Sequence, residues 1–532
     1  MRKFHSYEEV DKDVHYYVSR HELIDRAYNS LIGDTPEKGG HYITVWGPRQ
    51  SGKTWVMREV VRQLQAQQPE FEVAILSLQS ARSGSTDEKI LKLLVTQLKI
   101  GFKRDFPIIN DWEQLPTLFT SDYFDKPVIL ILDEFDSMGT EHINQFATEF
   151  RHIYISRQNE VNQPTGQKTY LLHSLALIGV RSVLGIENKS GSPFNIQRSL
   201  PIPHLTFAEV DSMFHWYERE SGQTVHQEVI DRVFHETQGQ PGLVGWLGEQ
   251  LTEDQFNKDT SKPIDMALFN QVYGAALYVL PNNNILNLIS KARQEPYKQV
   301  VLELFNTKKI PFSYDNPISN YLYLNGVISW EQEDTESYYT RFPCPFVQRR
   351  LFNAFTDDMF SNIGQLYPPF TDLSQVITAD TLNVKNLMRV YEQYLQKNRH
   401  WLLTDAPVRK DLRIYEAVYH FNLYSYLQAF FRQWKGRVYP EFPTGNGQID
   451  LLITYQGQQY GLEVKSFSDD SSYREGLTQS IRYGKRLGLK EVVMVTFIEQ
   501  VSDEIRQKYE APHLDNATGI TVLPVFVESM SK

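Results

Sequence analysis

The chain has 532 residues, which corresponds to three or four domains at about 150 residues each. Hydrophobic residues make up 41% of it and charged residues 22%, which excludes a wholly disordered chain. A single cysteine, Cys344, excludes an internal disulfide and a metal cluster held by cysteines. We find no apolar run long enough to span a membrane, and residues 1–17 carry charges throughout, unlike a secretory signal. We therefore expect a cytoplasmic protein without a membrane partner.

The net charge is −11, from 54 lysines and arginines against 65 aspartates and glutamates. This balance argues against a surface uniformly coated for nucleic acid, although a local basic groove is compatible with it. From residue 401 onward, 15 basic residues face 16 acidic ones, so nearly all the excess acid lies in the first 400 residues. Either this asymmetry is ordinary variation among solvated faces, or the C-terminal part has to tolerate a polyanion.

Residues 42–54 predict a strand, a phosphate-binding loop and the start of a helix. The loop reads G-x-x-x-x-G-K-T and ends at Thr54. Its glycines let backbone N–H groups turn toward phosphate oxygens, and the new helix offers its positive end to the same anion. Lys53 is expected to reach the β- and γ-phosphates, and Thr54 to bind Mg²⁺. The predicted ATP-binding residues of the loop are Gly47, Pro48, Gln50, Ser51, Gly52, Lys53 and Thr54.

Two further apolar runs predict buried parallel strands. The run at 126–133 ends in acidic residues, and ligands bind at the carboxyl ends of such strands. Asp133 is therefore expected to hold Mg²⁺ through water, and Glu134 to orient or activate the attacking water. The run at 170–181 ends at Arg181, which is expected either to sense the γ-phosphate or to lie on the surface.

The order of these motifs resembles the AAA+/STAND-type ATPases, in particular their archaeal-ATPase-like group. Tyr17 to Arg20 match the Y-V-x-R box that precedes the phosphate loop in that family. Leu205 to Glu209 match its L-x-x-x-E motif, in which Thr206 and Glu209 also form a predicted capping box. Gly239 to Pro241 match the Gly-x-Pro turn that brings a helical lid against the nucleotide.

The resemblance covers residues 10–260 and implies a P-loop parallel sheet with a small helical lid. We see no trans-acting arginine finger, which favours a nucleotide switch over a permanently active hexameric motor.

Residues 262–355 predict helix, helix and hairpin, an order that resembles the winged-helix domain following many such ATPases. The hairpin tip is acidic and would repel phosphate, so we favour a packing module over a DNA reader. A linker rich in Pro, Gly, Asp and Thr is expected at 356–384. The predicted helices are 297–305 and one from Asn316, and the predicted strands are 327–330 and 338–342.

Two runs of alternating polarity, 448–455 and 458–466, flank a Gln-Gly pair and predict a two-residue β-hairpin. Pairing the residues next to that turn places Asp450 directly opposite Glu463. Lys465 is two residues further along and shares their face.

Facing carboxylates repel unless a cation lies between them. Hard oxygen ligands favour Mg²⁺ or Mn²⁺, so Asp450 and Glu463 are predicted metal ligands. The metal would activate water, and Lys465 would orient that water or stabilise developing charge. The alternative is an ordinary surface face on which Lys465 neutralises the two acids.

Two helices complete the pattern. Glu416 lies on a predicted helix at 411–431, and Gln479 and Tyr483 are i, i+4 neighbours on a helix after the hairpin. With Asp450, Glu463 and Lys465 they resemble the PD-(D/E)XK nuclease superfamily, close to its RecB-like branch, over 385–532. One departure is that Gly-Gln-Ile precedes Asp450 where proline stands in the superfamily's name.

The sequence therefore predicts a multidomain α/β protein: a P-loop ATPase at 10–260, a winged-helix-like middle and a C-terminal restriction-endonuclease-like domain. The expected function is an ATP-controlled, divalent-metal-dependent nuclease, with DNA favoured over RNA and a role in defence or mobile elements. The alternatives are a signalling or DNA-translocating ATPase whose C-terminal domain binds without cutting, and a scaffold with relic sites. Oligomeric state and the need for a protein activator stay open. The predicted catalytic residues are Glu134, Glu416, Asp450, Glu463, Lys465, Gln479 and Tyr483.

Overall fold

The computed structural model describes residues 1–6, 10–81, 85–179, 197–253, 255–305, 309–404, 406–408, 414–441, 450–467 and 469–529. The chain divides into two compact units. Unit 1 is Met1–Asn284 with Tyr323–Gly326, and unit 2 is Ile285–Leu322 with Val327–Lys532. Within the described ranges, no helix is both long enough and apolar enough to cross a membrane.

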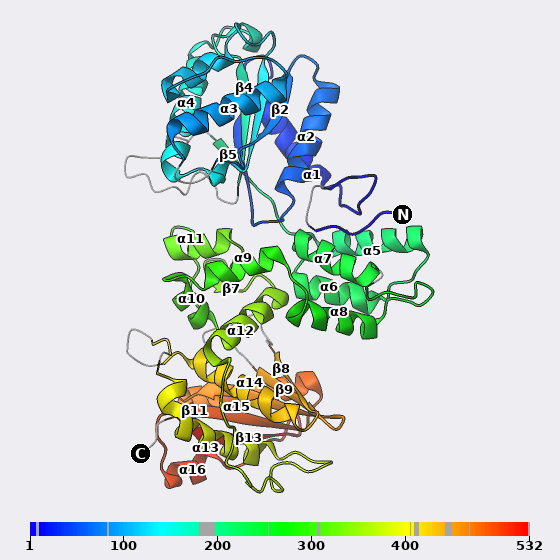
Figure 1. The fold of residues 1–532 in the computed structure, drawn as a ribbon, viewed down its shortest axis with the longest axis vertical. Coiled ribbons are helices and arrows are strands. Elements are labelled where there is room, and N and C mark those ends of the chain that lie inside the picture. Colours follow the sequence, from blue (N-terminus) through cyan, green and yellow to red (C-terminus); the bar gives the residue numbers. More distant parts are fainter. Residues whose placement is uncertain are drawn as a thin grey trace. The chain divides into compact units, whose positions relative to one another are not determined.

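Unit 1 contains a parallel sheet of five strands in the order β2-β3-β4-β1-β5 (Figure 1). Every residue of β3 and β4 is buried, as their unbroken apolar runs require of strands covered on both faces. The predicted strand at 42–46 and the α/β class of this region are confirmed. The strands are β1 (Tyr42–Trp46), β2 (Glu72–Ser77), β3 (Val128–Asp133), β4 (Leu172–Gly179) and β5 (Gln197–Pro201).

Helices cover both faces of this sheet (Figure 1). One face carries α1 (His21–Ile32) and α2 (Lys53–Gln67), whose apolar stripes pack on the odd residues of β1 and β3. The other carries α3 (Asp87–Phe102), α4 (Thr140–Asn159) and the 3₁₀ segment Trp112–Phe119.

A helical lid follows the sheet in sequence. Its first helix starts with the predicted capping box, in which Thr206 Oγ1 accepts from Glu209 N and Glu209 Oε2 accepts from Thr206 N. Gly239 has φ +70°, and a Cβ there would strike the carbonyl oxygen of Leu205, so this turn requires glycine. The lid helices are α5 (Phe207–Ser221), α6 (Gln227–Thr237), α7 (Pro241–Thr252) and α8 (Met266–Tyr278).

The middle region has the predicted order of helix, helix and antiparallel hairpin. Its last helix, α12 (Pro345–Phe360), runs five residues into the predicted linker. Rings of α12 pack on α14 (Glu416–Arg432): the ring centroid of Phe352 lies 5.1 Å from that of Phe421 and 5.0 Å from that of Tyr424. The remaining elements are α9 (Asn283–Ala292), α10 (Tyr297–Leu304), α11 (Pro317–Leu324), β6 (Ser329–Gln332) and β7 (Tyr338–Arg341).

Unit 2 also holds a mixed sheet of six strands in the order β12-β13-β11-β10-β9-β8. β10, β11 and β13 run parallel, and the other neighbours pair antiparallel. The strands are β8 (Arg437–Glu441), β9 (Asp450–Tyr455), β10 (Gln458–Ser466), β11 (Glu491–Ile498), β12 (His513–Asp515) and β13 (Ile520–Glu528). The helices are α13 (Val384–Leu402), α14 (Glu416–Arg432), α15 (Asp470–Leu487) and α16 (Asp503–Tyr509).

The β9–β10 hairpin has the predicted register, with Asp450 opposite Glu463. Gln456 and Gly457 both have positive φ, 49° and 75°, as a tight two-residue hairpin turn requires. The core face of the hairpin is apolar and buried, formed by Leu451, Ile453, Leu462 and Val464.

Candidate functional site

The phosphate loop joins the end of β1 to the start of α2. Gln50 (φ +57°) and Gly52 (φ +90°) take left-handed conformations that curl the backbone. The Lys53 ammonium folds back over the loop and donates to the carbonyl oxygens of Gly47 and Pro48, each at 2.8 Å. Ser51 is 1% exposed, and its Oγ is buried without a hydrogen-bond partner. A phosphate oxygen would satisfy such a hydroxyl, so the loop fits the nucleotide that its sequence predicts.

Two acids lie at the carboxyl end of β3, beside the end of β2. Asp133, the last residue of β3, is 9% exposed, and its Oδ1 accepts from the backbone N–H of Glu134 at 2.8 Å. Glu134 has φ +54°, and its Oε2 accepts from Ser77 Oγ at 3.2 Å. Ser77 ends β2 in register with Asp133, which brings all three side chains to one edge of the sheet.

Burial favours the neutral forms of the three ionisable side chains Lys53, Asp133 and Glu134. It lowers the pKa of Lys53 to about 8, against the pull of the nearby Asp136 and Asp133 carboxylates. It raises the pKa of Asp133, opposed by a hydrogen bond from Thr54 and by the charge of Lys53. Burial and the charge of Asp133 together raise the pKa of Glu134. A polyphosphate and a divalent cation would restore charge to these groups, which is the ligand pair that Thr54 and Asp133 fit.

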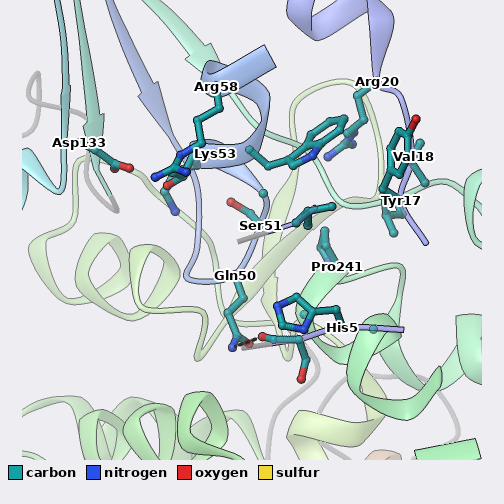
Figure 2. Close-up of a pocket in the computed structure, with 18 of the residues that line it drawn as sticks. His5, Tyr17, Val18, Arg20, Gln50, Ser51, Lys53, Arg58, Asp133 and Pro241 are labelled. Atoms are coloured by element: carbon teal, nitrogen blue, oxygen red, sulfur yellow. Dashed lines mark hydrogen bonds between the residues drawn. The ribbon is translucent and has the colours of Figure 1, made fainter. Parts of the chain in front are cut away.

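A cavity of about 580 Å³ opens beside the loop, the size of a small-molecule site (Figure 2). The lid contributes Met213 and Pro241, and the N-terminal segment contributes His5 and Tyr17. Several arginines add positive charge to the walls, namely Arg20, Arg58 and Arg62.

The Y-V-x-R and Gly-x-Pro motifs converge on this cavity. The ring of Tyr17 lies 5.7 Å from Trp55 of α2, and Arg20 Nη2 donates to the carbonyl oxygen of His204 at 3.1 Å. Gln240 Nε2 donates to the carbonyl oxygen of Arg49 in the phosphate loop at 3.2 Å. Arg181 lies outside the described residues.

Sequence reasoning missed two parts of the site: the residues before Tyr17 and the arginines of α2. The second could have been found, because Thr54, Arg58 and Arg62 are spaced by four and share one helix face.

The fold and this site define a protein with the architecture of a P-loop ATPase. The chain belongs to the AAA-like domain family, whose model matches residues 6–283. No curated protein matches it.

Three solved structures with a similar fold have low identity to the chain. The Walker-type ATPase PABY2304 of Pyrococcus abyssi is 15% identical with a TM-score of 0.41, over 65% of this chain and 99% of that one. The Aeropyrum pernix ORC1 protein, solved in complex with DNA, is 13% identical with a TM-score of 0.34, over 65% and 94%. The Thermotoga maritima RuvB Holliday junction branch migration motor is 11% identical with a TM-score of 0.33, over 60% and 92%.

A second, smaller cavity of about 150 Å³ lies in unit 2. It brings together three of the predicted catalytic residues: Glu416 from α14, Lys465 from β10 and Gln479 from α15. Lys465 Nζ lies 2.8 Å from Glu463 Oε1, and these side chains are 15% and 2% exposed. The full lining is Phe305, Glu416, His420, Val464, Lys465, Ser466, Ser472, Glu475, Gly476 and Gln479.

Two polar residues of this cavity were not predicted. His420 Nε2 lies 3.5 Å from Glu416 Oε1, and Glu475 Oε1 accepts from Gln479 Nε2 at 2.7 Å. Burial raises the pKa of Glu416, but His420 and the charge of Lys465 outweigh it, so this pKa lies below its usual range. Helix spacing could have indicated both residues, because each lies four positions from a predicted one.

Among the described side chains, Tyr483 and Glu463 do not line this cavity. Tyr483 is 3% exposed and packs with Val492 and Ile520. The backbone of Asp450 faces Glu463, but the Asp450 side chain lies outside the described part of the chain. Among the described residues, no group of three or more His, Cys, Asp or Glu side chains could hold a metal ion. The metal pair of Asp450 and Glu463 therefore stays a prediction.

Proposed function

We propose that unit 1 binds ATP with Mg²⁺ and hydrolyses it. The observation that carries this proposal is the convergence of Lys53, Asp133 and Glu134 at one edge of the parallel sheet. Lys53 neutralises the β- and γ-phosphates, and Thr54 with Asp133 would hold the metal. Bound Mg²⁺ supplies charge neutralisation at the oxygens of the transferred phosphoryl group.

Glu134 is the general base of this proposal, since it lies beside Asp133 and lines the cavity. It takes the proton of the attacking water, which requires its carboxylate within hydrogen-bonding reach of that water. In the structure Glu134 Oε2 accepts from Ser77 Oγ at 3.2 Å. This hydrogen bond competes with the turn of the carboxylate toward the attacking water.

The test is ATP turnover and ATP binding in the wild type, Lys53→Ala and Glu134→Gln. We expect Lys53→Ala to weaken ATP binding about 10- to 100-fold. We expect Glu134→Gln to bind normally but to hydrolyse about 10²- to 10⁴-fold more slowly, because only the base is removed. Turnover that survives Glu134→Gln would reject this assignment of the base, and a wild type that binds no ATP would reject the function.

We further propose that unit 2 is a divalent-metal-dependent nuclease under the control of ATP, with DNA favoured over RNA. It is supported by the facing positions of Asp450 and Glu463 and by one cavity shared by Glu416, Lys465 and Gln479. The exposed face of α15 is basic and suits a phosphate backbone, with Arg474, Arg482, Lys485 and Arg486. The rival is a unit that binds nucleic acid without cutting it.

A cleavage assay separates these readings. Plasmid, linear duplex, single-stranded DNA and RNA would be incubated with Mg²⁺ or Mn²⁺, with and without ATP. Glu463→Gln should abolish cleavage, whereas Glu491→Gln, an exposed carboxylate on the same sheet, should not. Lys53→Ala should remove only the response to ATP. Binding without cleavage under every condition would establish the rival.

A further inference from the structure

The N-terminal residues 1–6 and 10–18, here called the strap, form one wall of the nucleotide cavity in unit 1 (Figure 2). The strap doubles back on itself, because Lys3 N donates to Val14 O at 2.8 Å and Tyr16 N donates to Lys3 O at 3.0 Å. Its residues His5, Ser6 and Tyr17 all line the cavity. Nothing in the phosphate-loop motif requires such a wall, so its role has to be read from its contacts.

The strap lies against a face of lid helix α7 that has no side chains. Gly242, Gly245 and Gly248 recur every three residues and are all buried. A Cβ on Gly248 would clash with the ring of Phe4, and a Cβ on Gly245 would clash with the carbonyl oxygen of His5. The closeness of the strap to α7 therefore depends on these glycines.

The third glycine of the same face receives the phosphate loop. A Cβ on Gly242 would clash with the side chain of Gln50. Gln50 Nε2 donates to the backbone carbonyl oxygen of Ser6 at 2.9 Å. The backbone carbonyl oxygen of Gln50 accepts from Gly242 N at 3.2 Å. One loop residue is thus bonded to both the strap and the lid helix.

The far end of the strap is anchored on α5, away from the cavity. Arg2 Nη1 lies 2.5 Å from Glu220 Oε1, and Arg2 N donates to Glu220 Oε2 at 2.8 Å. The Arg2 guanidinium lies 4.7 Å from the ring centroid of Trp216. Phe4 is 3% exposed, with its ring 4.8 Å from that of Phe214. Neither Arg2 nor Glu220 lines the nucleotide cavity.

We propose that the strap clamps lid helix α7 onto the phosphate loop, and that Arg2 and Phe4 are positioning residues that set the rate of nucleotide release. A nucleotide can leave only when a wall of its cavity opens, and the backbone–backbone hydrogen bonds of the described strap residues run within the strap rather than to the sheet. Loosening the anchor on α5 frees Ser6 from Gln50 and opens the cavity at that side. This inference rests on nucleotide binding by unit 1, but on neither hydrolysis nor unit 2.

A charge swap tests the anchor at a distance from the nucleotide. The probe is N-methylanthraniloyl-ADP, preloaded on the full chain and chased with unlabelled ADP in a stopped-flow fluorimeter. Arg2→Glu and Glu220→Arg should each raise the dissociation rate about five- to tenfold, an effect of the size expected for one ordinary hydrogen bond. The double variant restores an opposite-charge pair but leaves the backbone N–H of residue 2 and Trp216 Nε1 without their acceptor, so it should recover only part of the change in rate.

Phe4→Ala gives an independent arm and should also speed release. The matched control is Gly274→Ala in α8, where a Cβ would meet nothing within 4 Å. Melting temperature is recorded for each variant, because a merely structural role would lower Tm and leave the dissociation rate unchanged. Unchanged release in Arg2→Glu and Phe4→Ala would overturn the clamp. A wild type that does not bind the labelled ADP would overturn nucleotide binding itself.

Discussion

Each unit of the chain holds a partly buried lysine in its candidate site, and the two lysines have different hydrogen-bonding and ion-pair partners. Lys53 of unit 1 is held by two uncharged carbonyl oxygens, and burial lowers its pKa to about 8. Lys465 of unit 2 lies 2.8 Å from a carboxylate on its own strand, Glu463. The carboxylates nearest to Lys53, those of Asp133 and Asp136, act on it only through their charge, so a triphosphate can bind the ammonium directly. The site in unit 2 already holds its own anion, so a phosphodiester would need a bridging cation or a rearranged ion pair to enter.

The largest effect is expected when the ion pair between Lys465 and Glu463 in unit 2 is broken. Glu463→Gln leaves Lys465 as a buried charge without its carboxylate, at an expected cost of about 3–5 kcal/mol in the free energy of unfolding. The contrasting change in unit 1, Lys53→Met, removes a charge that burial disfavours and should leave stability unchanged or higher without nucleotide. Thermal and denaturant unfolding of both variants measures this. Equal losses in the free energy of unfolding in the two variants would show that the two lysines contribute equally to stability.

Next in size is the effect of Lys53 on its ligand. Lys53→Ala should weaken ATP binding about 10- to 100-fold, since it removes a charged hydrogen-bond donor to phosphate. Lys465→Ala should leave ATP affinity within about twofold. Fluorescent ATP titrations measure both affinities. A substantial loss of ATP affinity in Lys465→Ala would mean that the two sites are coupled, contrary to the independent ligand binding inferred above.

Nucleotide affinity should also depend on pH through Lys53. The folded pKa of about 8 lies below the ordinary value of 10.5, so between these values the unfolded chain binds more protons, and folding stability from this group rises with pH. A bound triphosphate favours the charged lysine, so the complex holds more protons than the free protein. Affinity should therefore fall above about pH 8, by up to about tenfold per pH unit.

Isothermal calorimetry in buffers of different ionisation enthalpy, at about pH 9, measures the proton uptake directly. Lys53→Ala is the control, because it has no side chain to protonate. The same uptake in that variant would assign the proton to another group.

The smallest expected effect concerns Ser77. Removing its hydroxyl frees Glu134 from a 3.2 Å hydrogen bond. Such a bond contributes about 0.5–1.5 kcal/mol, so Ser77→Ala should raise ATP turnover roughly two- to tenfold at saturating ATP. Ser77→Thr keeps a hydroxyl and should behave like the wild type. A fall in turnover with Ser77→Ala would instead show that Ser77 helps Glu134 to act.

Local signals were enough to predict the phosphate loop and the β9–β10 register. The spacing of two glycines, a lysine and a threonine between an apolar run and a helical pattern determines β1, the loop and α2. A two-residue turn and a side-chain period of two leave one register that buries the apolar face, which placed Asp450 opposite Glu463. Both predictions depend on neighbours within about twenty residues.

Contacts between distant segments were not predictable in the same way. The strap has no helical or alternating pattern, and its partner α7 lies more than 200 positions away. The extension of α12 to Phe360 was missed because packing on α14 overrides the loop-like composition that follows. Tyr483 was predicted from the resemblance to the nuclease superfamily, and the sequence could not indicate that its ring packs with Val492 and Ile520.

The glycine face of α7 also lowers the intrinsic stability of that helix. Glycine in a helix interior costs about 0.5–1 kcal/mol relative to alanine, and Gly245 and Gly248 are both interior. Their summed deficit of about 1–2 kcal/mol has to be offset by what packs against them, and that is the strap. If the strap is displaced, α7 should therefore fray. Hydrogen exchange along α7 would then report whether the strap is in place, although the strap is not part of that helix.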